Sequence, residues 1–156
     1  MSVQVRDYTE SDLGPIARLY YETVRHVNAR DYTPVQIEAW APEVFPESYW
    51  AERFVPYRVF VAEHAGRVAG FIEFDPGGHI DCLYVHHACQ RAGVGRALME
   101  RIHHEAATAD TARLHADVSI TARPFFSSMG FAMLREQTRH YRGQDFAQFL
   151  MEKRLR

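Results

Sequence analysis

Cysteine is scarce in this sequence, and the two cysteines that it has belong to no recognisable motif. Cys82 and Cys89 are the only ones among 156 residues, too few for the disulfide framework that holds small secreted domains together. No Cys-x-x-Cys spacing, which would indicate a metal or redox site, is present. This usage suits a reducing compartment, so we expect a cytoplasmic protein.

An excess of positive charge is also missing. The 18 Lys and Arg residues against 20 Asp and Glu residues give a formal net charge of −2, which predicts no attraction of the whole chain to nucleic acid or to an anionic membrane. No apolar run approaches the roughly 20 residues that cross a bilayer, and the polar start MSVQVRDYTE does not resemble a secretory signal. We expect a soluble protein with no nucleic acid and no membrane as a partner.

What the sequence does have is the apolar content and patterning of one α/β domain. Its length and its hydrophobic fraction of 47% allow a single core over residues 1–156, and no composition break marks a linker. Alternation and helical spacing predict a strand at 2–8, helices at 13–24 and 35–41, strands at 58–64, 68–75 and 79–85, a helix from 94 to 108, a strand at 112–118, a short helix at 121–129, and strands at 131–136 and 147–155.

A loop with two glycines, Gln90-Arg91-Ala92-Gly93-Val94-Gly95, stands between a predicted strand and a predicted helix. It lacks the Lys-Ser/Thr pair of a nucleotide-hydrolase phosphate loop, and it lacks the third glycine and the βαβ context of a dinucleotide fingerprint. Glycines let backbone N–H groups approach an anion, the helix dipole favours negative charge, and the first acidic residue is Glu100. Arg91 and Arg96 add positive charge. The loop is either a diphosphate cradle or a tight strand-to-helix turn.

This loop resembles the Gln/Arg-x-x-Gly-x-Gly/Ala signature of the GNAT superfamily of N-acetyltransferases. Residues 119–131, Ser-Ile-Thr-Ala-Arg-Pro-Phe-Phe-Ser-Ser-Met-Gly-Phe, resemble a second motif of that superfamily, and the predicted order of elements is similar nearly end to end. Segments 26–42, 122–131 and 149–155 further resemble a bacterial, YafP-like branch. The resemblance implies an α/β GNAT fold, a mixed, mostly antiparallel and splayed sheet flanked by about four helices.

The resemblance also implies acetyl-CoA as co-substrate, no metal, and transfer of the acetyl group to a primary amine, of a small molecule, by direct attack. In the superfamily the loop and the first helical turn bind the pyrophosphate, while a β-bulge at the end of the preceding strand pairs with the pantetheine arm. These cofactor-binding roles fall here on Leu83, Tyr84, Val85, Gln90, Arg91, Ala92, Gly93, Val94, Gly95, Arg96 and Phe126.

Two other functions remain open from the sequence. One is a non-catalytic module that binds acyl-CoA as a sensor, and the other is acetylation of a protein lysine or N-terminus. Dimers are common among GNAT relatives, and the edge strand expected near the C-terminus would suit a homodimer. The acceptor itself is not identified by any motif.

The sequence departs from the superfamily at the usual proton donor. Phe126 stands where many members carry the tyrosine that protonates the departing thiolate, and Ser119 replaces an asparagine. A thiol is already a fair leaving group, so polarisation of the thioester and proximity alone would support the reaction. Tyr84 and Ser127 are the substitute catalytic donors. Their structural alternatives are a core-facing strand residue and a solvated helix residue.

An attacking ammonium must first lose a proton to a base or to a water chain. Strand alternation places every second residue from His79 to Val85 on one face. Asp81 on that face stands where some GNAT enzymes carry their catalytic base, and His79 is placed for a proton relay through histidine. The structural alternatives are a strand-end salt bridge for Asp81 and an exposed turn residue for His79. Glu73 and Asp75 on the preceding strand are the reserve bases.

Aromatic residues gather in the N-terminal helical region, which covers the acceptor site in this superfamily. Most of them should belong to the core, because aromatic residues at helical spacing usually do. We expect Tyr32, Trp40 and Glu73 to bind the substrate, and carboxylates nearby to attract the amine. The candidates for this attraction are Asp31, Glu38 and Glu43.

Histidine is plentiful, with nine residues that include the adjacent pairs His86-His87 and His103-His104. Neighbouring residues on a helix or strand point apart and therefore do not form a pair of metal ligands. We expect no metal site.

Overall fold

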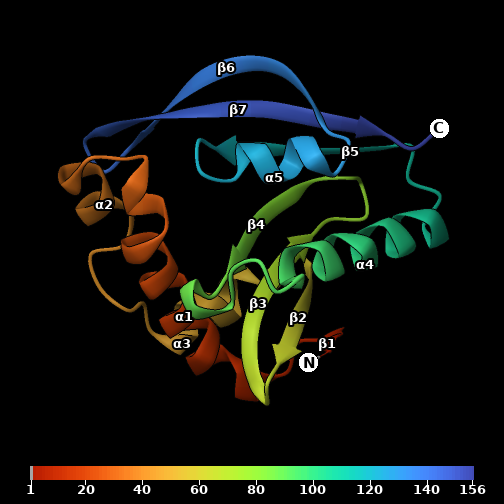
Figure 1. The fold of residues 1–156 in the computed structure, drawn as a ribbon, viewed down its shortest axis with the longest axis horizontal. Helices are drawn as coiled ribbons and strands as arrows, with labels where there is room; N and C mark the ends of the chain where they lie inside the picture. Colours follow the sequence, from red (N-terminus) through yellow and green to blue (C-terminus); the bar gives the residue numbers. More distant parts are fainter. Residues whose placement is uncertain (1) are drawn as a thin grey trace.

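The computed structural model describes residues 2–156 as five α-helices and seven strands (Figure 1). The strands are β1 (Val3–Asp7), β2 (Arg58–His64), β3 (Arg67–Phe74), β4 (Ile80–Val85), β5 (Arg113–Ser119), β6 (Ala132–Tyr141) and β7 (Gln144–Arg154). The helices are α1 (Leu13–His26), α2 (Pro34–Trp40), α3 (Glu47–Arg53), α4 (Val94–Thr108) and α5 (Arg123–Ser128), with short 3-10 turns at Glu10–Asp12, Asn28–Arg30 and His87–Cys89. Within residues 2–156, every helix is too short or too polar to cross a membrane.

The first sheet has the order β1-β2-β3-β4, and all of its neighbouring strands are antiparallel. Strand β2 shows how the sequence builds its two covered faces. Val59 and Val61 pack with residues of α1 and α3, whereas Phe60 and Ala62 pack with residues of α4. Because side chains alternate along a strand, a continuously apolar strand indicates a sheet with helices on both faces.

The second sheet has the order β5-β7-β6 and touches the first sheet at one end only. Among the described residues, the bridge that joins β4 to β5 is the parallel pair His79–His115. Gly78 sits at this junction with a φ of +112°, and a Cβ there would lie 2.0 Å from the Arg113 carbonyl oxygen. Figure 1 shows β4 and β5 diverging away from this point, with the start of α4 beside the opening. The two strands therefore form the sides of a wedge.

The predicted fold class is confirmed, but one helix was missed. Helix α3 follows Pro46, so residues 2–156 form five helices instead of about four. Its start could have been read from Pro46 followed by an acidic residue, Glu47, in the first turn. Strands β6 and β7 are also longer than predicted. Strand β6 is exposed along most of its length, so its sequence lacks the alternation that predicts a strand.

The register between β3 and β4 shifts by one residue opposite Glu73. As a result, Asp81 and Cys82 together face this part of β3. The sequence had indicated regular alternation through β4 and a bulge at residues 83–85. Both expectations were wrong, because the extra residue lies nearer the start of the strand and breaks the alternation there.

Candidate active site

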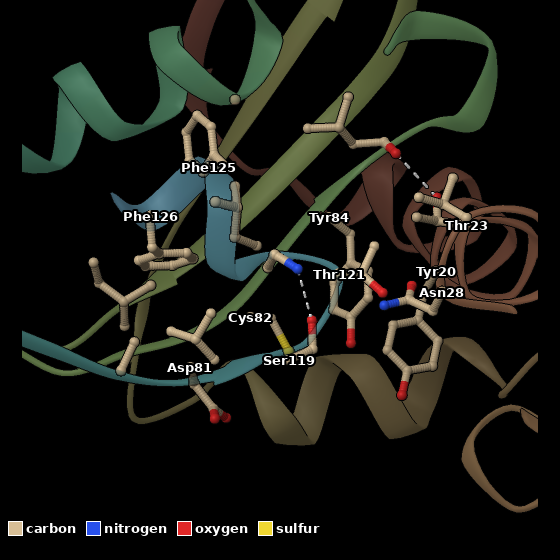
Figure 2. A pocket seen from close by; sticks show the side chains of 18 of the residues that line it. Tyr20, Thr23, Asn28, Asp81, Cys82, Tyr84, Ser119, Thr121, Phe125 and Phe126 are labelled. Atoms are coloured by element: carbon tan, nitrogen blue, oxygen red, sulfur yellow. Dashed lines mark hydrogen bonds between the residues drawn. The ribbon is translucent and has the colours of Figure 1, made fainter. Parts of the chain in front are cut away.

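A cavity of about 540 Å³ lies in the wedge between β4 and β5. Its walls come from α1, α2, α3, β4, the start of α4, β5 and α5, with further residues from β6 and β7, and Figure 2 shows part of them. Asp81, Tyr32 and Trp40 line it, as do nearly all the residues that were predicted to bind the cofactor. Four predicted site residues lie outside its lining: Glu73, His79, Ala92 and Ser127.

The start of α4 presents an open, positively polarised end to the cavity. Gly93 is the N-cap in the left-handed conformation, with a φ of +84°, and nothing lies within 4 Å of where its Cβ would be. The first turn contains no acidic residue. The first helical backbone bond runs from the Ala97 N–H to the Gly93 carbonyl, so the preceding N–H groups are free to bind an anion.

Gly95 and Gln90 contact other segments of the protein. A Cβ on Gly95 would lie 3.2 Å from the Phe125 ring, so this glycine lets α5 approach α4 closely. The Gln90 side chain donates to the Val85 carbonyl at 2.8 Å, and the Thr23 hydroxyl donates to the same oxygen at 3.2 Å (Figure 2). The Val85 carbonyl oxygen thus accepts two hydrogen bonds within the protein, and the Gln90 side chain holds the loop against β4.

Arg53, the last residue of α3, joins the polar groups at the other end of the cavity. Its Nε donates to Glu73 at 2.7 Å, and its Nη2 donates to Glu73 at 3.1 Å, to the Cys82 sulfur at 3.1 Å and to Asp81. Three potential metal ligands from Glu73, Asp81 and Cys82 lie within 4.8 Å of one another. The Arg53 guanidinium lies among these three groups and supplies the positive charge there. The sequence did not single out Arg53, because α3 was not expected.

Glu73 is fully buried, with 0% of its surface exposed. Burial raises the pKa of Glu73 to about 7, although Arg53 acts in the opposite direction. Arg53 therefore sits between a buried carboxyl group that titrates near neutral pH and the Asp81 carboxylate on the cavity wall.

Replacing Glu73 by glutamine should flatten the dependence of stability on pH. The Glu73 pKa is about 7 in the folded state and about 4.5 in the unfolded chain, so the unfolded chain loses the proton first. The free energy of unfolding therefore falls as the pH rises from about 4.5 to about 7. A shift of this size corresponds to roughly 3 kcal/mol. Urea unfolding of the wild type and of Glu73→Gln across this range tests it. Equal slopes would show that Glu73 does not titrate there.

Asp81 is the predicted base that reaches the cavity. Its side chain is 33% exposed and lines the cavity wall. His79 instead lies against His115, with ring centroids 5.1 Å apart, and 6.4 Å from the ring of Tyr57. Asp75 accepts a bond from the Gly77 N–H in the turn that precedes β4. The register shift in β4, not simple alternation, determines which of these groups faces the cavity.

Tyr84 and Tyr20 place two phenol groups side by side on the cavity wall (Figure 2), with ring centroids 4.8 Å apart. Burial raises the pKa of Tyr84 well above its ordinary value, so its hydroxyl keeps its proton at neutral pH. Phe126 is 3% exposed and offers only a ring. Ser127 is exposed and outside the lining. Of the two predicted donors, Tyr84 is the one at the cavity.

Tyr32 lines the cavity with its ring, which meets Trp40 edge to face at 5.2 Å. Its hydroxyl is used within the fold, because it donates to the Ala147 carbonyl at 2.8 Å and accepts from the Ile120 N–H at 3.0 Å. The carboxylates considered for attracting the amine lie outside the lining: Asp31, which accepts from Thr121, Glu38, which pairs with Arg25, and Glu43.

His86 and His87 point toward the same neighbour, so the expectation that they point apart was wrong. Both follow β4 in a turn, where strand alternation no longer applies. Their Nε2 atoms lie 3.1 and 3.6 Å from a Glu22 oxygen, and their rings stack at 4.4 Å. The Ala88 N–H donates to Nδ1 of His86, and the Arg67 guanidinium lies 3.1 Å from Nε2 of the same ring. The three groups thus form a hydrogen-bonded cluster of potential metal ligands.

Comparison with known proteins gives consistent matches along the chain. The family model described as Acetyltransferase (GNAT) domain matches residues 28–155. The chain is 32% identical over 150 residues to the uncharacterized N-acetyltransferase YafP of Escherichia coli (strain K12), covering 96% of this chain and 95% of that protein. A GCN5-related N-acetyltransferase from Rhodopseudomonas palustris superposes with a TM-score of 0.93 at 28% identity, covering 99% and 97% of the two chains. The paia N-acetyltransferase from Thermoplasma acidophilum, solved in complex with coenzyme A, has a TM-score of 0.77 at 19% identity over 99% of each chain.

Proposed function

Because the chain belongs to the GNAT family of acetyl-CoA-dependent N-acetyltransferases, we propose that it moves the acetyl group of acetyl-CoA to the primary amine of a small molecule by direct attack. The observation that carries the proposal is the single cavity that runs from the free N–H groups of α4 to the Asp81 carboxylate. Such a cavity holds an anionic cofactor and a cationic amine at opposite ends. The proposal treats residues 1–156 as one cytoplasmic domain that needs no metal.

Each proposed role follows from where the side chain lies. The first turn of α4 and the positive charges of Arg91 and Arg96 bind the diphosphate. The edge of β4 that faces away from β3 is unpaired along most of its length, and its backbone groups hold the pantetheine arm. Asp81 takes the proton from the attacking amine. Tyr84 supplies the proton that the departing thiolate needs.

A non-catalytic acyl-CoA sensor is the second candidate, and the observation that favours it is Phe126. This residue brings a ring without a hydroxyl to the cavity wall. The two candidates share the cofactor site and differ at the acceptor end. A sensor needs no carboxylate on the wall and shows no turnover with any amine, whereas the enzyme needs Asp81.

Thermal unfolding in the presence of acetyl-CoA, CoA or NAD tests the cofactor site. A ligand at about 100 times its dissociation constant stabilises the folded state by roughly 2.7 kcal/mol, which raises the midpoint of a domain of this size by several degrees. We expect this shift with acetyl-CoA and CoA, and none with NAD. Release of free thiol in the presence of an amine library then separates the enzyme from the sensor. Absence of any shift with either CoA species would contradict both.

A further inference from the structure

Two buried side chains on the cavity wall have polar atoms without a partner among the described residues, the Trp50 indole N–H and the Asn28 carboxamide. The Asn28 carboxamide both donates and accepts, so it says more about what binds there. Asn28 belongs to the 3-10 turn that follows α1 and is 5% exposed. It lines the cavity, and Figure 2 shows its carboxamide among the side chains that form the wall. Among the hydrogen bonds of residues 2–156, its backbone carbonyl accepts from the Asp31 N–H, while neither side-chain atom has a partner within the protein.

Other polar side chains of the same segment are fully engaged. The Tyr32 hydroxyl both donates and accepts. Gln36 accepts from the Thr33 N–H at 2.8 Å and donates to the Asp145 carbonyl at 2.7 Å. Buried polar groups are nearly always hydrogen-bonded, because an unpaired one loses its solvation without compensation. A carboxamide left open toward a cavity therefore indicates a group that binds there.

Asn28 lies on the side of the cavity away from the start of α4. In Figure 2 it lies close to Tyr20 and Thr121, apart from Phe125 and Phe126. Phe125 is the residue that packs against Gly95 at the start of α4, where the diphosphate would bind. This position favours a partner in the molecule that receives the acetyl group over the diphosphate of the cofactor.

A carboxamide offers an oxygen that accepts and an NH2 group that donates. Another amide, with one carbonyl and one N–H side by side, satisfies both at once. We propose that Asn28 binds an amide group of the acceptor, so that the preferred substrate is a small primary amine that also carries a carboxamide. This inference rests on the proposed function and names the substrate class for the same site.

Matched pairs of acceptors test the inference by steady-state kinetics. Each pair consists of an ω-amino primary amide and the n-alkylamine of the same chain length, over a series of lengths. We expect the wild type to favour the best amide over its alkylamine about 10- to 100-fold in kcat/KM, mainly through KM. Asn28→Leu should remove this preference without changing the KM for acetyl-CoA. Gln36→Ala, a polar residue of the same segment outside the lining, should retain it.

A binding measurement keeps the test independent of turnover. The side-chain NH2 resonances of Asn28, identified by their loss in Asn28→Asp, should shift when pentanamide is added to the CoA-bound protein, and should not shift with pentylamine. No shift, or an equal preference for the two acceptors in the wild type, overturns the inference while leaving the acetyltransferase proposal intact. A loss of acetyl-CoA affinity in Asn28→Leu with unchanged selectivity also overturns it, because Asn28 would then contact the pantetheine amides. A shift without turnover of any amine supports the amide site and contradicts the proposed reaction.

Discussion

Replacing Arg53 by methionine should lower the free energy of unfolding more at pH 8 than at pH 5, by about 1–2 kcal/mol, because the Glu73 carboxylate loses its counter-ion only where it is ionised. Glu73 is 0% exposed and receives two bonds from this guanidinium. Above the Glu73 pKa of about 7, the carboxylate loses its counter-ion and must take up a proton or stay charged without it. Near pH 5 the carboxyl group is neutral in both proteins, so the loss should be smaller there.

Urea unfolding at the two pH values, with a double variant as control, isolates this effect. In Arg53→Met combined with Glu73→Gln the buried carboxylate is gone, so the extra loss at pH 8 should disappear. A single variant that is equally destabilised at both pH values would contradict the argument, because the loss would then come from packing of the Arg53 stem. The contact of Arg53 with Asp81 contributes little to the expected loss, since that carboxylate is a third exposed.

The conformation of the glycine loop could be predicted from the sequence because its signal is local. Gly93 needs a positive φ, the first turn of α4 lacks acidic residues, and the loop that carries both is continuous in sequence. Gly95 and Gln90 also make contacts within the protein that were not predicted. Their packing against Phe125 and Val85 depends on segments far apart in the chain, so it could not be read from the loop alone.

The rest of the cavity wall could be predicted only in part, because its decisive contacts are long-range. Asp81 was identified, but a one-residue register shift beside Glu73 decides what it faces, and strand patterns do not show such shifts. Arg53 comes from a short helix with few sequence signals. Asn28 stands out only when its neighbours Tyr32, Gln36 and Thr121 are seen to have partners within the protein. A pattern in sequence indicates which face is buried, not which buried group is left unpaired.

Replacing Asp81 by asparagine should lower kcat for amine acetylation by about 10²–10⁴-fold, the usual contribution of a positioned general base. Asparagine keeps the shape of the side chain and still accepts a bond from Arg53, but it cannot take up a proton. The thermal shift with acetyl-CoA should be the same as in the wild type, since the first turn of α4 lies at the other end of the cavity. Thiol release under saturating acetyl-CoA measures the loss.

The matched control is Asp75→Asn, which removes a carboxylate at the end of the neighbouring strand. Asp75 lies outside the cavity lining and accepts a hydrogen bond from the Gly77 N–H in a turn. The turnover of Asp75→Asn should therefore stay near that of the wild type. If Asp81→Asn also kept its turnover, the proton would have to leave by another route. Glu73 would then be the next group to test, because its pKa of about 7 suits proton transfer at neutral pH, but it is fully buried and outside the lining. A chain of water molecules past Arg53 would be required to connect it with the amine.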